Sequence, residues 1–296
     1  MSATPGPDVL SRVPGADTAV PLQVESLTGG LTNRSFRVTT SQGRYVVRLG
    51  TAYDSLLAID RRAETKAQRL AADAGVAPRV IDADIASGLL ITEYAPGRSW
   101  TATDFTDPRQ IDRLGAQLAS LQAIDARAAP GLARLDPTVL ARGYVRRIVA
   151  AAPEEQRHLE PMLTEAQRRW RDSGASARSP VLTHSDLHGS NLVDGGTRLW
   201  LIDWEYAALA DPLHDVACVL AYHPEAVSHL PRLLAALGLE RITTPAVLDA
   251  AIWLFQLLVF LWYRARRVAV AASAAEQAAE ERAARVLASL MHNRSL

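Results

Sequence analysis

Two hydrophobic patterns divide the chain, and the first is typical of strands. From Val24 to Leu49 apolar residues alternate with polar ones, with a glycine-containing turn at SQGR between two strand-like segments. Residues 78–97 predict two further strands joined by a polar turn at Ala86–Gly88. Between these pairs, residues 58–75 hold helix formers and apolar positions at helical spacing, with Gly75 where a C-cap belongs. This N-terminal part therefore predicts a small sheet with one helix.

The second pattern is helical and fills most of the remaining chain. Residues 107–124 and 136–152 each begin with Asp-Pro, the aspartate suited to the N-cap and the proline to the first helical position. The apolar run Ala251–Tyr263 is too short to span a bilayer, is interrupted by Gln256, and predicts a buried helix. Residues 179–207 differ, since two short apolar pieces there enclose a polar loop and a Gly-Gly turn. The pattern predicts an α+β fold, with a sheet in a small N-lobe and a mainly helical C-lobe that carries a small hairpin.

Composition and punctuation set the expected boundaries and partners. We place the lobe boundary at Pro96–Gly97, which gives an N-lobe at residues 21–95 and a C-lobe at residues 96–296. Residues 1–20 lack a charged region followed by an apolar one, so we expect a flexible leader and no signal peptide. The zero formal net charge gives no electrostatic argument for nucleic acid or an acidic membrane as a partner, and we expect neither. Cys218 is the only cysteine, which favours the cytoplasm; nothing in the sequence predicts the oligomeric state.

A polar loop, THSDLHGSNLV at residues 183–193, carries the candidate chemistry. Asp186 and Asn191 lie five residues apart in it, and Asp203 ends the next strand-like piece, LWLID. If the Gly195–Gly196 turn folds the two pieces into a hairpin, the oxygens of these three side chains converge. Carboxylate and amide oxygens suit Mg²⁺, and phosphoryl transfer also needs an acceptor for the nucleophile's proton. We therefore predict Asp186 as the catalytic proton acceptor, with Asn191 and Asp203 as metal ligands.

The histidines of this loop leave another interpretation open. His184 and His188 are four residues apart, a spacing found in zinc sites, and with Asp186 they would suit a zinc-dependent hydrolase. No third histidine or cysteine partner is apparent in the sequence. We expect His184 to contribute to catalysis by bracing the loop and not by transferring a proton.

The quoted motifs resemble those of a known superfamily. HSDLHGSN resembles the His-x-Asp-x-x-x-x-Asn catalytic loop of the protein-kinase-like superfamily in its small-molecule branch, which includes aminoglycoside phosphotransferases, and LIDWEYA resembles its Asp-Phe-Gly counterpart. GGLTNRSF, VVRL, GVAPRVI and DPLHDVA look most like segments of choline and ethanolamine kinases. The resemblance covers roughly residues 24–224. It implies a protein-kinase-like two-lobe fold, ATP and Mg²⁺ as cofactors, and a small-molecule alcohol as the substrate that is phosphorylated.

The resemblance also implies roles for individual N-lobe residues. Arg48 stands where protein kinases have a lysine; the only lysine of the chain is Lys66, on the following helix. An arginine still supplies a permanent cation for phosphates. Glu64 matches the helix glutamate that pairs with this strand. The residues expected to bind nucleotide, from the nucleotide loop to the hinge, are Gly29, Gly30, Asn33, Arg48, Glu64, Glu93 and Tyr94.

The acceptor alcohol is less well defined. Choline and ethanolamine are the first expectation, and a quaternary ammonium needs an aromatic cage with a carboxylate beside it; the candidates are Trp204, Glu205, Tyr206 and Trp262. Thiamine kinases share LIDWEYA and are an alternative. An aminoglycoside or another small alcohol is a third, although six arginines against three glutamates from Ala251 onward suit a polycation poorly. A non-catalytic nucleotide-binding relative is the alternative from another class.

Overall fold

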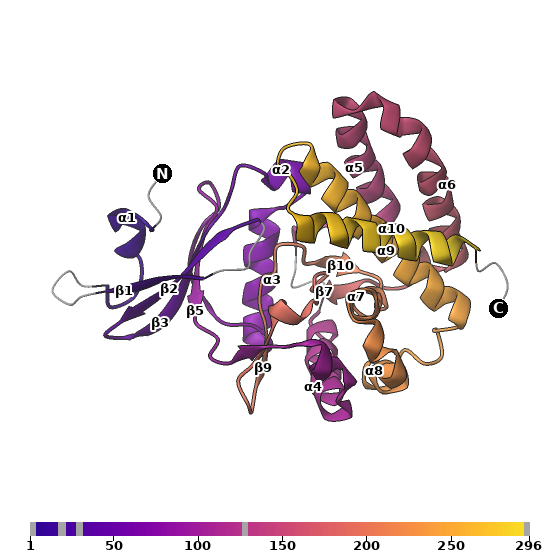
Figure 1. Ribbon diagram of the computed structural model, residues 1–296. Helices are drawn as coiled ribbons and strands as arrows, with labels where there is room; N and C mark the ends of the chain where they lie inside the picture. Colours follow the sequence, from indigo (N-terminus) through magenta and orange to yellow (C-terminus); the bar gives the residue numbers. More distant parts are fainter. Residues whose placement is uncertain (1–3, 17–21, 28–31, 126–129, 293–296) are drawn as a thin grey trace.

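The computed structural model describes residues 4–16, 22–27, 32–125 and 130–292. Figure 1 shows a sheet at one end of the molecule and a larger group of helices at the other, with helix α3 (Arg61–Asp73) between them. The predicted α+β, kinase-like organisation of a small antiparallel-sheet lobe followed by a mainly helical one is confirmed.

The N-lobe sheet has five antiparallel strands in the order β1-β2-β3-β5-β4. Their bounds are β1 (Gln23–Leu27), β2 (Arg34–Thr40), β3 (Gly43–Leu49), β4 (Val80–Asp84) and β5 (Leu89–Glu93). The sequence pattern predicted four strands here, and the structure divides the first of them into β1 and β2. The short helix α2 (Asp54–Leu57) precedes α3, which is capped by the Asp60 side chain at one end and followed by Gly75 in a left-handed conformation at the other.

The N-terminal segment differs from the flexible leader that the sequence suggested. Helix α1 (Pro7–Leu10) lies beside the sheet, and Val13 is only 2% exposed. Val13 packs in one cluster with Val38 and Val47, because burying an apolar side chain stabilises the segment that carries it. Residues 17–20 of the expected leader, like residues 1–3, lie outside the described residues.

Seven α-helices build most of the described C-lobe. They are α4 (Pro108–Gln122), α5 (Pro137–Ala151), α6 (Gln156–Asp172), α7 (His214–Tyr222), α8 (Leu230–Leu237), α9 (Pro245–Arg267) and α10 (Ala274–His292). Both Asp-Pro helices are confirmed, since the carboxylates of Asp107 and Asp136 accept hydrogen bonds from the first backbone amides of α4 and α5. Short 3₁₀ turns connect these helices at Ala102–Thr106, Pro153–Glu155, Ala175–Ala177, Gly189–Asn191 and Pro224–His229.

Helix α9 extends the predicted apolar run at both ends. By length and composition it is apolar enough to cross a membrane, a test that core helices of soluble proteins also pass. In the structure it packs against α5, α6, α7 and α10. Trp253, Leu257 and Leu261 lie on it with 1% exposure or less, so α9 is a core helix of the C-lobe, as predicted.

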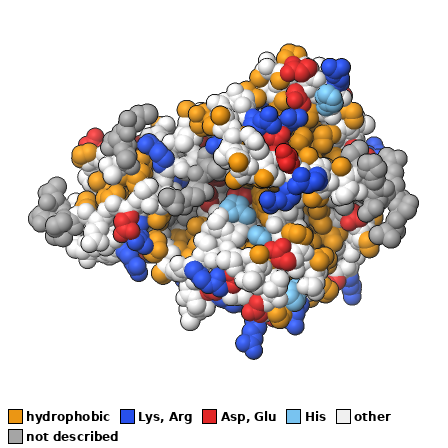
Figure 2. Space-filling model, in the orientation of Figure 1, with side chains coloured by type: hydrophobic (Ala, Val, Ile, Leu, Met, Phe, Trp, Pro, Cys, Tyr) orange, Lys and Arg blue, Asp and Glu red, His pale blue; other side chains and the backbone are white. Residues whose placement is uncertain are grey.

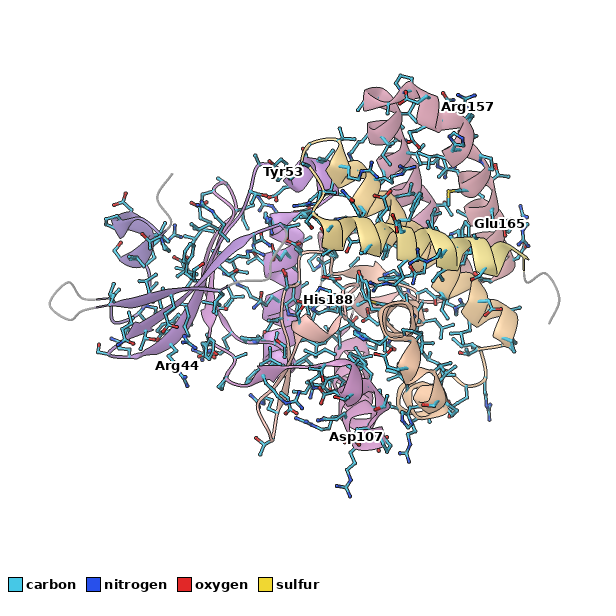
Figure 3. The ribbon with its side chains drawn as sticks, in the orientation of Figure 1. Arg44, Tyr53, Asp107, Arg157, Glu165 and His188 are labelled. Carbon is cyan, nitrogen blue, oxygen red and sulfur yellow. The ribbon has the colours of Figure 1, made fainter. Side chains whose placement is uncertain are left out.

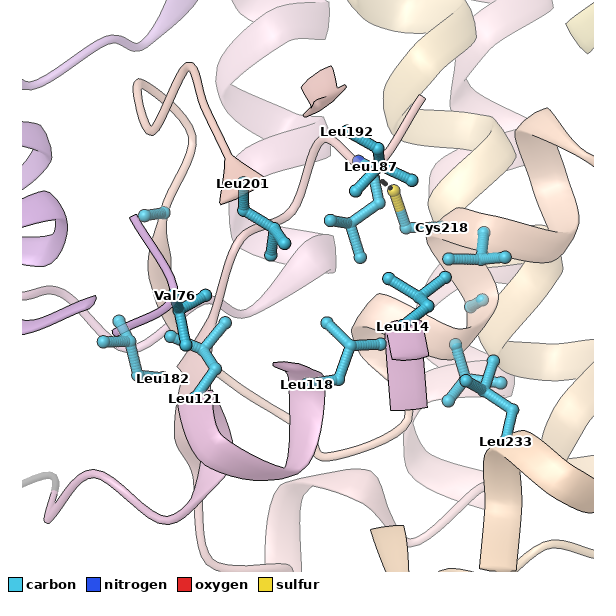
Figure 4. Packing of buried hydrophobic residues seen from close by; sticks show 14 of the residues in the cluster. Val76, Leu114, Leu118, Leu121, Leu182, Leu187, Leu192, Leu201, Cys218 and Leu233 are labelled. Atoms are coloured by element: carbon cyan, nitrogen blue, oxygen red, sulfur yellow. Dashed lines mark hydrogen bonds between the residues drawn. The ribbon is translucent and has the colours of Figure 1, made fainter. Parts of the chain in front are cut away.

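Two small sheets carry the polar loop of residues 183–193. One pairs β7 (Val181–Thr183) with β10 (Ala208–Ala210), and the other has the order β6-β8-β9, with β6 at Arg98–Ser99, β8 at Leu192–Asp194 and β9 at Leu199–Leu201. The Gly-Gly turn forms the predicted hairpin, in which Leu192 pairs with Leu201. Leucines from the loop, the hairpin and α4 pack together beneath this region (Figure 4). The loop is therefore supported by the hydrophobic core of the C-lobe.

Candidate active site

The hairpin brings the two halves of the motif together. The Ile202 amide donates to the Asn191 carbonyl at 3.0 Å, and the ring of His184 bonds the Ile202 carbonyl at 2.9 Å. Asp203 therefore returns beside Asn191, as the spacing predicted. Gly189 lies in the same loop, and a Cβ there would meet the Trp100 carbonyl oxygen at 2.6 Å, so only glycine fits this close approach.

His184 is fully buried and braces the loop. Besides the bond to the Ile202 carbonyl, its Nδ1 accepts from the Asp186 amide at 3.3 Å, and its ring lies 4.6 Å from that of Trp204. Burial lowers the pKa of His184 to about 4, so the ring is neutral at physiological pH. Because both ring nitrogens contact backbone atoms, this arrangement offers His184 neither as a proton donor nor as a zinc ligand.

His184→Gln is expected to reduce the loss of stability in acid. Between pH 6.5 and about 4 the unfolded chain binds a proton at His184 that the folded chain does not, so this part of the stability is complete above pH 6.5 and is lost as the pH falls. Within this window the wild type loses about 1.4 kcal/mol per pH unit relative to the variant. Urea unfolding at pH 7.5, 6 and 5 measures the difference. A gap between the two proteins that stays constant over this range would contradict the assignment.

Asp186 lies in the middle of the loop with both carboxylate oxygens engaged. Asn191 Nδ2 donates to Oδ2 at 2.9 Å, the Tyr222 hydroxyl donates to Oδ1 at 3.2 Å, and His188 Nε2 lies 3.4 Å from Oδ2. Burial alone would raise the pKa of Asp186, but the hydrogen bond and charge of His188, with smaller contributions from His184 and Tyr222, bring it below its usual value. The side chain is 15% exposed, so an ionised carboxylate remains accessible to a reactant.

The surroundings of Asp186 open to solvent where the two lobes meet. His188 is 39% exposed and lies between the N-lobe and the helices (Figure 3). Figure 2 shows histidine atoms at the surface near the middle of this face, at a hollow between the lobes. The loop is therefore accessible to solvent on this side.

Asp203 has the features of a cation ligand. Its backbone is left-handed, with φ of +65°, a costly conformation for a residue that is not glycine. Within the described part of the chain its buried Oδ1 has no hydrogen-bond partner, and burial, with the charge of Glu205 next in effect, raises its pKa well above the usual value. One carboxylate oxygen from each of Glu64, Asp203 and Glu205 lies within 4.8 Å of the others. A divalent cation would satisfy the unpaired oxygen of Asp203, whereas the carboxylates of Glu64 and Glu205 already accept from arginines of the N-lobe.

Asn191 completes the predicted ligand pair. Its Nδ2 donates to the carbonyl and the carboxylate of Asp186, both at 2.9 Å. The amide oxygen is therefore the end turned away from Asp186, and Asn191 is 5% exposed. The same residue thus orients the carboxylate with one end and has an oxygen for a cation at the other.

Arg48 and Glu64 form a buried ion pair across the N-lobe. Both guanidinium nitrogens of Arg48 bond the Glu64 carboxylate, one of them at 2.8 Å. Strand β3 directs Arg48 toward α3, away from the face that buries Val47 in the sheet cluster. The contact is the one that the resemblance implied between strand cation and helix glutamate. A bidentate arginine fixes the carboxylate more rigidly than a lysine does.

Arg61 joins the nucleotide-loop side of the N-lobe to the segment after Asp203. Its guanidinium bonds four side chains, and its side chain is 5% exposed. The acceptors are Asp54 at 2.6 and 2.8 Å, Asn33 at 2.8 Å, and Glu64 and Glu205 at 3.1 Å. Glu205 also accepts from Thr32 and Asn33, each at 2.7 Å. Sequence reasoning missed Arg61, because one arginine in a charged helix is ordinarily a solvated one.

The structure describes only some of the residues expected to bind nucleotide. Gly29 and Gly30 lie outside the described residues. The amides of Glu93 and Tyr94 donate to the carbonyls of Arg79 and Arg44, so any adenine-contacting amide of this segment lies beyond Tyr94. The Glu93 carboxylate pairs with Arg79 at 3.1 Å, and the Tyr94 ring lies beneath Arg37 and Arg44. Their side chains therefore contact arginines of the N-lobe at the end of β5.

The four residues expected at the acceptor fall into three environments. Trp204 is fully buried, and its indole donates to the Leu201 carbonyl at 3.0 Å, so the substrate contact predicted for Trp204 does not fit its position in the core. The Glu205 carboxylate accepts hydrogen bonds from Arg61, Thr32 and Asn33 of the N-lobe. The contact with an ammonium group predicted for Glu205 therefore does not fit its position. Tyr206 and Trp262 remain, and the Trp262 indole donates to the Tyr206 hydroxyl at 2.7 Å.

Several aromatic side chains lie in the region of Asp186. Burial raises the pKa of Tyr206 and Tyr263, and the nearby charge of Asp186 adds to both increases, as it does for Tyr222. The Trp262 and Tyr263 rings meet edge to face at 5.0 Å. Four aromatic side chains from α7, α9 and the segment after Asp203 thus lie together near the carboxylate. The acceptor residues predicted from the sequence did not include Tyr222 or Tyr263, since both lie on helices where an aromatic side chain ordinarily packs in the core.

The arginines at the end of α9 are paired. Arg266 bonds Glu276, Arg267 bonds Glu280 at 2.9 Å, and Arg264 bonds Glu155 at 3.1 Å. The first two contacts join α10 to α9 (Figure 1), the third joins α9 to the turn at Pro153–Glu155, and together they neutralise much of the local positive charge. The charge argument against a polycationic acceptor therefore loses its basis in the structure.

Known proteins share both the fold and part of the sequence. Protein LicA of Haemophilus influenzae is 28% identical over 211 residues, which cover 66% of this chain and 57% of that protein; the chain thus spans less than two thirds of its length. A choline/ethanolamine kinase family protein of Mesorhizobium loti superposes with a TM-score of 0.74 at 26% identity, over 97% of this chain and 94% of that one.

Two structures of lower identity show the fold alone. Choline kinase LicA of Streptococcus pneumoniae has a TM-score of 0.74 at 22% identity, over 92% of this chain and 95% of that one. A structure of LicA with AMP has a TM-score of 0.69 at 20% identity, over 91% and 92%.

The family itself is given by a model that matches well over half of the chain. The description of this family is phosphotransferase enzyme family, and the match covers residues 23–250. This range includes the five-stranded sheet, the loop with Asp186 and Asn191, and the hairpin that ends at Asp203. The chain therefore belongs to the APH phosphotransferase enzyme family.

Proposed function

We propose that the protein is an ATP- and Mg²⁺-dependent kinase that phosphorylates the hydroxyl of a small amino alcohol, choline or ethanolamine first. The observation that carries this proposal is the convergence of Asp186, Asn191 and Asp203 beside a group of aromatic side chains. Family membership supports the phosphotransferase class, and the names of relatives support the amino alcohol. The cytoplasmic location expected from the single cysteine belongs to the same proposal.

The nucleotide is proposed to lie between the sheet and the hairpin. Arg48 is a permanent cation held in place by Glu64, and we propose that it contacts the nucleotide phosphates together with Gly29 and Gly30. Adenine would be bound by backbone groups after Tyr94. The LicA structure with AMP supports nucleotide use in this fold.

Asn191 and Asp203 would hold Mg²⁺ through their side-chain oxygens. When bound, the ion supplies positive charge that offsets the charge developing on the transferring phosphoryl group. Asp203 suits this role because its Oδ1 is buried and unpaired in the described structure.

Asp186 is proposed to accept the proton of the acceptor hydroxyl. As the alcohol oxygen forms its bond to the γ-phosphorus of ATP, the bond to the leaving ADP oxygen breaks and the proton passes to the carboxylate. The pKa of Asp186, below its usual value, keeps it ionised and able to accept. Asn191 and Tyr222 hold its two oxygens, so the carboxylate is oriented before the alcohol arrives.

A panel of acceptors tests the proposal directly. ADP release from the purified protein with MgATP is measured with choline, ethanolamine, thiamine, homoserine, an amino sugar and an aminoglycoside. Turnover with choline or ethanolamine that exceeds all the others supports the proposal. A preference for thiamine or an aminoglycoside would show that the acceptor is that compound and not choline or ethanolamine. ATP binding without transfer to any alcohol would favour a non-catalytic nucleotide-binding protein.

Trp262→Leu is expected to raise KM for choline about tenfold while leaving KM for ATP unchanged. A cation over an aromatic face gains about 0.5–2 kcal/mol, and the leucine keeps an apolar side chain without the ring. The Trp200→Leu variant is the control, because Trp200 lies on β9 with its ring beneath Arg198. Steady-state kinetics with each substrate varied in turn gives both constants. An unchanged KM for choline in Trp262→Leu would remove Trp262 from the acceptor site.

A further inference from the structure

Helix α7 holds the loop of residues 184–189 by a series of hydrogen bonds along its length. Asp215 accepts from the amides of His184 and Ser185, both at 2.9 Å. Cys218, one turn later, accepts from the Leu187 amide at 3.0 Å (Figure 4). His223, just after the helix, accepts from the Gly189 amide at 3.1 Å. The loop backbone is therefore fixed to one helix from its first residue to its glycine.

Tyr222 is the member of this series that reaches the reacting group. It follows Asp215 and Cys218 by seven and four residues, and so lies on the same helix face. Its hydroxyl donates to Asp186 Oδ1 at 3.2 Å. The ring is held edge to face by His188 at 5.7 Å and by Phe255 at 5.4 Å. Two perpendicular ring contacts leave the phenol little freedom to turn away.

We propose that Tyr222 is a positioning residue for the reaction, which holds Asp186 Oδ1 so that the carboxylate stays turned toward the acceptor hydroxyl. The inference rests on the proposed function, because it takes Asp186 as the proton acceptor. Asn191 holds only Oδ2, so rotation of the carboxylate about its Cβ–Cγ bond is opposed there by the hydrogen bond to one amide. The bond from Tyr222 adds a second restraint at the other oxygen, and Oδ1 retains a lone pair for the proton of the alcohol.

The phenol remains a donor throughout the physiological range. Burial raises the pKa of Tyr222 well above its usual value, and the charge of Asp186 raises it further. Tyr144 provides the comparison within this chain: its hydroxyl donates to the Leu57 carbonyl at 3.0 Å, in the core and without contact to the loop. One tyrosine bonds a backbone group, and the other bonds the group that reacts.

Tyr222→Phe, which removes only the hydroxyl, tests the proposal. The expected result with choline and MgATP is a kcat about tenfold lower, equal to about 1.4 kcal/mol of transition-state stabilisation, with KM for choline, KM for ATP and Tm close to wild type. Tyr144→Phe is the matched control, expected to lower Tm and to leave kcat unchanged. A wild-type kcat in Tyr222→Phe would overturn the positioning role. A fall in kcat together with a lower Tm and higher KM values for both substrates would also overturn it, because the hydroxyl would then serve the fold as a whole.

A double-mutant cycle gives an independent reading. Phe255→Leu removes one of the rings that hold Tyr222 and is expected to lower kcat by itself, but to lower it no further in the Tyr222→Phe background. Additive losses of kcat would mean that Phe255 acts independently of Tyr222, and that the ring contact between them does not position Asp186. If the wild type phosphorylates neither choline nor ethanolamine, the proposed acceptor fails. The Tyr222→Phe comparison is then made on ATP hydrolysis, in which Asp186 accepts the proton of water.

Discussion

Asp186→Asn is expected to lower phosphoryl transfer by about 10²- to 10⁴-fold, the range that a positioned general base contributes. Asparagine has the shape of aspartate, and its one oxygen accepts from either the Tyr222 hydroxyl or the Asn191 amide, but an amide cannot take up the proton of the alcohol. The loss should therefore appear in kcat. ATP affinity, measured by calorimetry with a non-hydrolysable analogue and Mg²⁺, should stay close to that of the wild type.

A second aspartate serves as the control for this substitution. Asp112 is exposed and pairs with Arg232 at 3.0 Å on the surface, so Asp112→Asn removes a carboxylate of no catalytic consequence. Wild-type turnover is expected in this variant. Full activity in Asp186→Asn would end the proposed mechanism, whereas loss of ATP binding in the same protein would show that Asp186 acts on the nucleotide.

Local spacing predicted the hairpin that brings Asp203 beside Asn191. Asp186, Asn191 and Asp203 fall within a segment of eighteen residues. The Gly-Gly turn in this segment can pair the two short strands in one register that directs the apolar side chains of both toward the core. The Asp-Pro helix starts were predictable for the same reason, since an N-cap is decided by neighbouring residues.

Contacts between distant segments were beyond the sequence pattern. Arg61 meets Glu205 across 144 residues, and Tyr222 meets Asp186 across 36, so no periodicity relates either pair. The side-chain directions in LIDWEYA were also not predictable from the pattern. Trp204 lies in the core and the Tyr206 hydroxyl meets Trp262. The left-handed backbone of Asp203, between β9 and Trp204, interrupts the alternation of a strand at this point. Such a turn costs energy locally and is retained only where packing on both sides determines it.

The Arg61 contacts also bear on how the lobes are held. Arg61 and Glu205 come from different lobes and are both buried, and Glu205 in turn accepts from Thr32 and Asn33 beside the nucleotide loop. Removing one member of a buried charged group leaves the others unpaired, which is costly. The lobes are therefore joined through the same carboxylate cluster that lies next to the metal candidate Asp203. Glu205 thus links Thr32 and Asn33 of the N-lobe to the neighbourhood of Asp203.

Asp203→Asn is expected to act on activity and stability in opposite directions. Loss of the carboxylate should remove the Mg²⁺ response and lower phosphoryl transfer by at least about 100-fold, since a metal ion contributes several kcal/mol of charge stabilisation. In metal-free buffer the variant should melt a few degrees higher than the wild type, because Asp203 Oδ1 is buried without a partner and near Glu205. The pKa of Asp203 is raised by folding, so ionising it costs stability as the pH rises, and the advantage of the variant should grow with pH.

Thermal melting with and without Mg²⁺ at pH 6.5 and 8.5, together with turnover, measures these effects. Asp194→Asn is the matched control: Asp194 ends β8 and is held by both Arg113 nitrogens at 2.9 Å, so its loss should lower Tm and leave the Mg²⁺ response intact. Mg²⁺-dependent turnover that survives in Asp203→Asn would move the ion elsewhere. A lower Tm for that variant in metal-free buffer would mean that the Asp203 carboxylate is stabilised by a partner in the protein. The opposite signs expected for two aspartates nine residues apart follow from one difference: Asp194 is paired with the guanidinium of Arg113, whereas Oδ1 of Asp203 has no partner among the described residues and is proposed to bind a cation.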